Sequence, residues 1–342
     1  MTATTPEVKA RPTRVSASEA RFKEDIGLRP GWVTVAAKEF ADHIQSVRFY
    51  VLLVVLGIAA IIPLYFAAEL IRSAASSVSG VPAIFLAMFL VSPEGADLVR
   101  VDAFVAIAAP LLGVAFAFDA VNGERHEGTL PRLLSQPIHR DDVINGKFVA
   151  GLAAIALALA ALLLVVSGFG MFRLGISPSL EEILRLVAWY FVTLLYVALW
   201  LAFGLLLSVV IRRAATSALV GFGVWLFVAV PIFGPFLVGL LGGILAGGST
   251  TISEYLGTTE SVQRILPGTL YQEASFAILS PGVTTVSRAD FYGASAVPVQ
   301  GTLLTLDQSL LIVWPHLVVL FALTIGCFAL AYARFMRQEV RA

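Results

Sequence analysis

Six long apolar stretches without Asp, Glu, Lys or Arg recur along this chain of 342 residues, and they restrict its possible folds more than any other feature. A helix needs roughly 20 mainly apolar residues to cross the hydrocarbon core of a bilayer, and in lipid only helices or closed barrels satisfy their own backbone groups. The stretches approach or exceed this length: 51–68, 103–118, 148–172, 186–211, 214–253 and 308–333. The sequence therefore predicts an all-α integral membrane protein with six transmembrane helices.

Composition supports the same class of protein. Hydrophobic residues make up 58% of the chain and charged residues only 13%, whereas about a quarter of the residues in soluble domains are charged. The chain has 23 Lys and Arg against 23 Asp and Glu. This balance gives no indication of a nucleic-acid partner, so the lipid bilayer is the partner that the composition predicts.

Two apolar segments do not have the length of a single crossing. The stretch 214–253 is too long, and Pro231 and Pro235 interrupt it. Because proline breaks the interior of a helix, we expect one crossing from about 215 to 238, followed by an outer segment. The apolar run 81–91 is too short to span the bilayer, so we expect it to be interfacial or re-entrant.

The distribution of basic residues predicts the orientation. Cytoplasmic loops of membrane proteins carry an excess of Lys and Arg. If both termini lie in the cytoplasm, six spans place 17 of the 23 basic residues on the cytoplasmic side and 6 outside. We therefore expect a multi-pass protein of the plasma membrane with both termini cytoplasmic.

The expected spans divide the chain into three parts. Residues 1–30 are polar and basic, which predicts a flexible cytoplasmic tail. In 31–50, apolar residues recur at helical spacing, which predicts an amphipathic helix in the membrane interface, although a soluble helix packed on the tail is an alternative. Residues 51–338 form the six-span domain, with an outer segment at 246–309 between spans five and six.

The chain lacks the motifs of several chemistries. Gly146-Lys147 looks like the end of a phosphate-binding loop, but the upstream glycine is missing and Phe148 replaces Ser or Thr. Cys327 is the single cysteine and the four histidines are scattered, so the sequence predicts neither a disulfide nor a metal site within one chain. We expect no catalytic residue and no cofactor in this chain.

The densest charged segment between two apolar stretches runs from Asp119 to Lys147. Gly128-Thr129 predicts the start of a short helix, because a threonine side chain can cap free backbone N–H groups. Pro137 ends this helix, since the residue before a proline is pushed away from helical angles. Three leucines share its face: Leu130, Leu133 and Leu134. The alternative is an ordinary loop helix whose leucine face is buried.

This segment also resembles a known family. It is similar to the segment between the second and third spans of ABC transporter permeases of the type-2 exporter branch. The matching positions are Glu124, Arg125, Gly128, Thr129, Leu130, Leu133, Leu134, Pro137, Gly146 and Lys147. The chain departs from the pattern near His139, where family members usually carry Ser or Thr.

The resemblance implies a function. In that family the short helix between spans two and three is a cytoplasmic coupling helix that docks on an ATPase subunit. The ATPase-coupling residues would be Glu124, Arg125, Glu127, Gly128, Thr129, Leu130, Leu133, Leu134 and Pro137. ATP and Mg²⁺ would bind to that partner, and a homodimer or a paired second permease would form the export pathway. The helix at 31–50 would correspond to the family's elbow helix.

Two other functions remain open at this point, namely an ion-coupled secondary transporter or channel, and an intramembrane enzyme. Charged residues at mid-membrane usually mark ion or proton pathways. None of the six stretches places one clearly at its centre, and His316 is expected near the outer end of the last span. This scarcity favours a pump that is driven by a partner subunit. The transported substrate is not readable from the residues.

Overall fold

The computed structural model describes residues 30–73, 83–91, 100–129, 138–228, 233–245, 258, 261–283 and 303–338. Within these ranges every regular element is an α-helix. The expected tail at 1–30 lies outside the described residues except for Pro30. The all-α fold predicted from the sequence is therefore confirmed for the described part of the chain.

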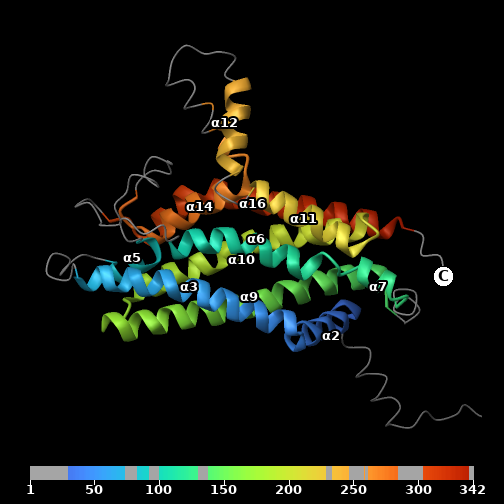
Figure 1. Cartoon of the computed structure of the whole chain (residues 1–342), viewed down its shortest axis with the longest axis horizontal. Helices are drawn as coiled ribbons and strands as arrows, with labels where there is room; N and C mark the ends of the chain where they lie inside the picture. The colour runs from blue at the N-terminus through green and yellow to red at the C-terminus, as the bar shows by residue number, and fades with distance from the viewer. Residues whose placement is uncertain are drawn as a thin grey trace, which may run out of the picture.

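Five helices in the described residues are long and apolar enough to cross a membrane. They are α3 (Val47–Ser73), α6 (Val101–Ala117) continued through a turn into α7 (Asn122–His126), α9 (Arg140–Leu174), α10 (Leu180–Val210) and α16 (Leu306–Met336). Together they form one elongated bundle of nearly parallel and antiparallel helices (Figure 1). The chain is thus a multi-pass helical membrane protein.

The expected fifth crossing at about 215–238 is not one continuous helix. The apolar helix α11 ends after 15 residues (Ala214–Val228), and α12 (Phe233–Leu245) begins beyond a gap in the described residues. At about 1.5 Å per residue, α11 is roughly 22 Å long, which is short of the bilayer core of about 30 Å. Pro235 lies in the first turn of α12, where a proline is tolerated because it needs no hydrogen-bond partner there. Figure 1 shows α12 projecting away from the side of the bundle.

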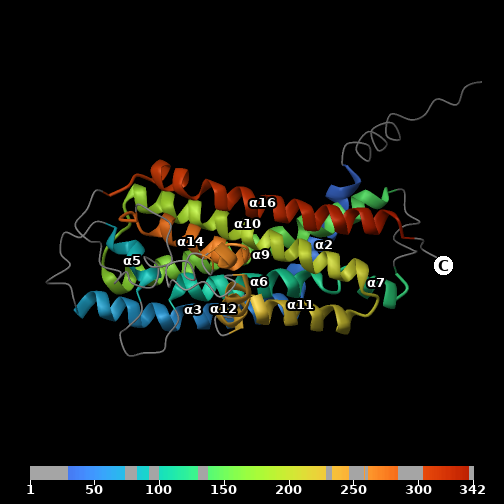
Figure 2. The same ribbon diagram turned by 90° about the horizontal axis from the view of Figure 1, so that it is seen from above.

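The helix α10 forms the centre of the bundle. It packs against α16 and α6, and the views in Figures 1 and 2 agree on this placement. Gly113 of α6 allows the closest approach, because a Cβ at this position would lie 2.7 Å from the backbone nitrogen of Leu201. Small residues at helix contacts are typical of membrane bundles, where close packing replaces the hydrophobic effect as the source of association.

The chain enters the bundle through α2 (Gly31–Gln45), which packs against the beginning of α9. Ser46 has an extended conformation and separates α2 from α3. Its hydroxyl accepts a hydrogen bond from the backbone N–H of Phe49 at 3.3 Å, so it caps the new helix. Residues 47–50, which the sequence assigned to the interfacial helix, are therefore the first turn of α3.

Part of the expected outer segment is packed into the bundle. The helix α14 (Pro267–Leu279) buries ten of its 13 residues against α10, α16 and α6. Ser275 accepts a hydrogen bond from the indole of Trp189 at 2.6 Å, and Tyr271 stacks on Tyr196 with ring centroids 4.5 Å apart. Ser275 and Tyr271, two of the polar residues that made this segment read as extramembrane, thus have their partners on α10.

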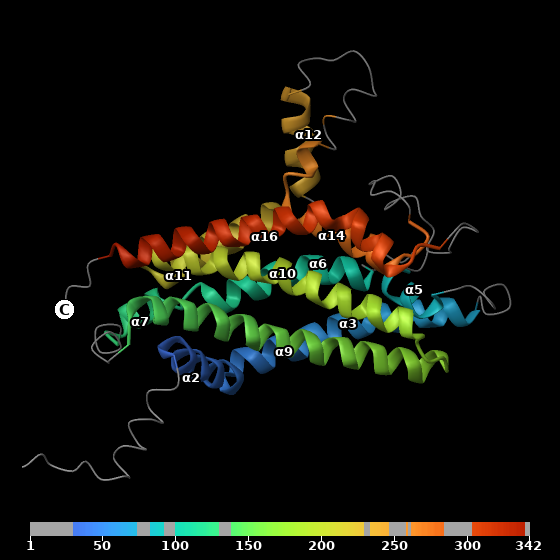
Figure 3. The ribbon, with the colours of Figure 1, turned by 180° about the vertical axis from the view of Figure 1, so that it is seen from behind.

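The short helix α5 (Ile84–Leu90) lies at the end of the bundle opposite to α2 and α7, as Figures 1 and 3 show. It has seven residues, so it is far too short to cross the membrane, as the sequence predicts for 81–91. Glu182 of α10 accepts the backbone N–H of Phe85 at 3.0 Å. This contact fixes the start of α5 on the bundle.

Candidate functional site

The two flanks of the segment that resembles the family's coupling element lie at the same end of the bundle as α2 and the last turn of α16 (Figure 3). The structure describes both of its flanks, 119–129 and 138–147. Four of the predicted coupling residues lie outside the described residues: Leu130, Leu133, Leu134 and Pro137. The geometry of the site is therefore that of the two flanks and of the helices that hold them.

The first flank is anchored to the end of α10. Ser208 accepts hydrogen bonds from the backbone N–H groups of Val121 and Asn122, at 2.9 and 3.2 Å. The side-chain amide of Asn122 donates to the carbonyl of Ile211 at 3.2 Å. Because carbonyls at a helix C-terminus lack partners within the helix, these contacts satisfy the end of α10 and fix the position of α7.

Arg125 connects the first flank to the C-terminal end of α16. Its guanidinium donates to the Val209 carbonyl at 3.4 Å and to the side-chain oxygen of Gln338. The Gln338 amide donates to the same Val209 carbonyl at 2.8 Å. From the second flank, Arg140 donates to the backbone carbonyl of Gln338 at 3.0 Å. Gln338 therefore joins the two flanks to each other and to α10.

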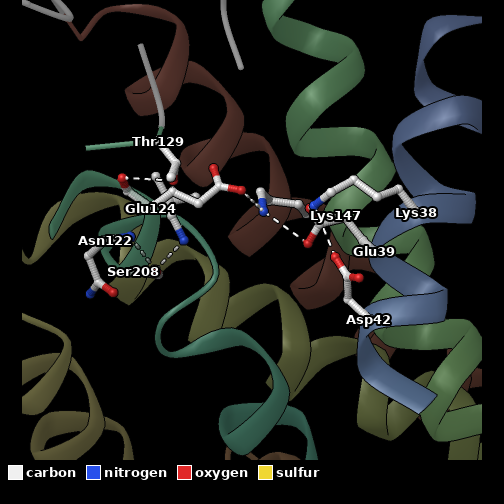
Figure 4. Close-up of polar contacts among 9 residues, drawn as sticks. Lys38, Glu39, Asp42, Asn122, Glu124, Thr129, Lys147 and Ser208 are labelled. Atoms are coloured by element: carbon white, nitrogen blue, oxygen red, sulfur yellow. Dashed lines mark hydrogen bonds and ion pairs between the residues drawn. The ribbon is translucent and has the colours of Figure 1, made fainter. Parts of the chain in front are cut away.

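Lys147 forms the second link, shown in Figure 4. Its ammonium lies 2.8 Å from a carboxylate oxygen of Glu124 and 3.0 Å from one of Glu39. Only 4% of the Lys147 side chain is exposed, so its charge requires an acidic partner, and two carboxylates lie within ion-pair distance. The three residues connect α7, α9 and α2.

Burial alone would raise the pKa of Glu39, but the nearby ammonium groups of Lys147 and Lys38 outweigh it and hold the pKa below its usual value. Glu39 is therefore ionised at neutral pH. The ion pair with Lys147 is fully formed under these conditions.

The glycine that precedes Lys147 sets how closely α2 approaches. A Cβ on Gly146 would lie 2.7 Å from the side chain of Val35. At the N-terminus of α2, the carboxylate of Asp142 accepts the backbone N–H of Trp32 at 3.0 Å, and it also accepts the N–H of His139 at 3.1 Å. The Gly-Lys pair of the motif thus has a structural explanation, because the missing side chain of the glycine lets α2 approach closely and the lysine forms an ion pair with Glu39 of α2.

The remaining predicted residues lie at the end of the first flank. Gly128 has a φ of 68°, a left-handed conformation that favours glycine. Thr129 donates from both its backbone N–H and its hydroxyl to the carbonyl of Glu124, at 2.9 and 3.2 Å. The hydroxyl therefore closes the turn that precedes it. The side chain of Glu127 in this turn is exposed. The cap that Thr129 is expected to form for the next helix falls outside the described residues.

Sequence reasoning missed three residues that complete this site, namely Glu39, Ser208 and Gln338. They come from parts of the chain far from the motif, up to 213 positions away in the case of Arg125 and Gln338. A lysine at the beginning of an apolar helix was the available signal, since a buried lysine requires an acidic partner. The described residues contain no group of three or more His, Cys, Asp or Glu that could hold a metal ion.

Comparison with known proteins gives the family. The model of the ABC-2 family transporter proteins matches residues 33–340. The chain is 34% identical over 138 residues to a probable ABC transporter permease protein NosY from Stutzerimonas stutzeri. The aligned region covers 39% of this chain and 48% of that protein. It is 38% identical over 74 residues to the protein of the same description from Pseudomonas aeruginosa, covering 22% and 25%.

The aligned regions thus span about half the length of the first relative and a quarter of the second. The family model, in contrast, covers nearly the whole chain, including every helix described from α3 to α16. The chain therefore belongs to the ABC-2 transporter family, as a membrane-spanning permease.

Proposed function

We propose that a separate ATPase subunit docks on residues 124–137 of this permease, and that ATP and Mg²⁺ bind to that subunit alone. The observation that carries the proposal is the buried Lys147, which holds Glu124 on one side and Glu39 on the other. An ordinary connector between two spans needs no such anchoring. A docking element does, because force applied to a loosely held loop would not reach the helices.

The contacts of the two flanks support a route for this force. Through Lys147 and Glu124, a displacement of the loop moves α9 and α2 together. Through Arg125 and Gln338 it also reaches the ends of α10 and α16. Closure of the ATPases would thus act on four helices at the cytoplasmic end, rather than on one.

The same proposal includes the orientation and assembly. Both termini lie in the cytoplasm of a plasma-membrane protein, which the 17 to 6 distribution of basic residues supports. The position of α2, α7 and the last turn of α16 at one end of the bundle agrees with this (Figure 1). In this orientation α11 is part of the fifth of six crossings, and two permeases, identical or paired, form an export pathway.

The test is the double substitution Leu133→Asp with Leu134→Asp. If the leucine face contacts the ATPase, two apolar contacts become buried carboxylates, each costing several kcal/mol while they stay desolvated. We expect the permease to remain inserted, the ATPase to be lost on co-purification, and transport to fall to background.

The matched control is Arg132→Ala in the same segment, since a charge at the rim of an interface is worth at most about 1 kcal/mol. Normal ATPase binding by the double variant would mean that the leucines pack on the permease itself. The proposed docking site would then be wrong.

A further inference from the structure

A cavity of about 280 Å³ lies between the junction of α2 with α3 and the end of α6. Five lining residues are apolar: Val51, Leu52, Ala115, Phe116 and Phe118. Four are polar: His43, Ser46, Arg48 and Asp119. The sequence explains this division, because the chain changes there from an amphipathic helix to an apolar one. The cavity is therefore amphipathic.

The polar side of the cavity carries one positive and one negative charge. Arg48 and Asp119 form an ion pair at 2.5 Å, and the Arg48 guanidinium lies 5.5 Å from the centre of the Phe118 ring. The Arg48 side chain is 63% exposed, so it is available to a further partner. Burial is the main cause that lowers the pKa of His43, which is therefore neutral at neutral pH and adds no charge.

We propose that this cavity binds one phospholipid of the cytoplasmic leaflet whose headgroup carries both a phosphate and a primary ammonium. Arg48 would hold the phosphate, since a guanidinium binds phosphate oxygens through two parallel hydrogen bonds. Asp119 would accept the ammonium. An acyl chain would lie along Leu52, Ala115 and Phe116. The leaflet assignment rests on the orientation given under the proposed function.

Charge and position favour this occupant over others. A purely anionic headgroup would be repelled by Asp119, whereas a zwitterionic one matches both charges. The cavity also lies just before α7, so a lipid bridging Arg48 and Asp119 would hold α3 against α6 beside the docking segment.

The test compares how much lipid the full-length wild type and its variants retain after purification in mild detergent. Native mass spectrometry measures the bound lipid, and the lipids are extracted and identified. Ala115→Phe fills the cavity, and Ala153→Phe makes the same change at an exposed position of α9. We expect the wild type and Ala153→Phe to retain about one ammonium-bearing phospholipid per chain. Ala115→Phe should lose it by about tenfold or more, because the apolar contacts of the acyl chain are displaced.

Two surface variants test the headgroup without changing the packing. Asp119→Asn should reduce the preference for the primary ammonium over choline and glycerol headgroups with the same acyl chains. Arg48→Gln should reduce the retention of all three. Equal retention of every headgroup by the wild type, or unchanged retention by Ala115→Phe, would show only annular lipid and overturn the proposal.

Co-purification of the ATPase is measured on the same samples. If the wild type retains every headgroup equally while the ATPase stays bound, this inference alone fails. If the wild type retains the ammonium-bearing lipid but no ATPase binds, the proposed docking site alone fails.

Discussion

Replacing Lys147 with methionine tests the buried link between α7, α9 and α2. The change keeps a long unbranched side chain but leaves Glu124 without a cation and Glu39 with only the exposed Lys38. Their side chains are 13% and 19% exposed, so water compensates them only in part. The second carboxylate oxygen of Glu124 is already buried without a hydrogen bond, which adds to the cost.

The expected magnitude follows from this burial. Removing one partner of a fully buried pair costs about 3–5 kcal/mol, and the partial exposure of both carboxylates lowers this to about 2–4 kcal/mol. We expect Lys147→Met to lower the melting temperature in detergent by several degrees. It should also weaken co-purification with the ATPase, because Glu124 is released next to the docking segment.

Two further variants separate the ion pair from simple packing. Lys38→Met removes a partner of the same Glu39, but Lys38 is 60% exposed, so its loss should cost under about 1 kcal/mol. The triple variant Lys147→Met, Glu39→Gln and Glu124→Gln removes all three charges and should regain most of the stability. If Lys147→Met is no less stable than Lys38→Met, the buried pair does not hold α2 and the reasoning is refuted.

Three other predictions concern single contacts. Gly146→Leu should detach α2 from α9, because the new Cβ would lie 2.7 Å from Val35; faster proteolysis near residue 30 would report it, and unchanged protection would contradict it. Glu273 is 5% exposed and lies 2.8 Å from the His316 ring. Replacing His316 alone with leucine should therefore lower the melting temperature more than replacing both residues with apolar ones, and the reverse order would contradict a paired role. Because folding lowers the pKa of Glu39, the stability that it contributes is complete above its ordinary pKa of 4.5 and is lost as the pH falls through its lower pKa in the folded protein. The melting temperatures of Glu39→Gln and the wild type should therefore approach each other as the pH falls below 4.5, and a difference that does not change with pH would contradict this.

The contact between Glu273 and His316 also shows what the sequence did not indicate. From the residues, His316 was expected to be anchored at the outer interface of the last span. The structure buries it against α14, a helix that the sequence assigned to the outer segment. A segment with Glu273, Tyr271 and Ser275 reads as polar, and nothing local indicates that α10 and α16 supply its partners.

The elements with strong local causes were predictable. Each of the five long helices contains nearly all of one expected apolar stretch and extends beyond it, because a chain in lipid must satisfy its backbone within each segment. The end of the fifth crossing was placed too late, at about 238, whereas α11 ends at Val228. The break at Ser46 was missed, since the residues on both sides of it are equally suited to a helix.

For the candidate site, the sequence by itself determined the motif, its place between two spans and the family to which it belongs. Only the tertiary structure decided what holds it. Lys147 binds Glu39, which lies 108 positions earlier, and Arg125 binds Gln338 at the other end of the chain. The physical reason is that lipid and protein interior are both apolar. Hydropathy therefore finds the helices, but it does not tell which of their faces meet or which buried charges are brought together.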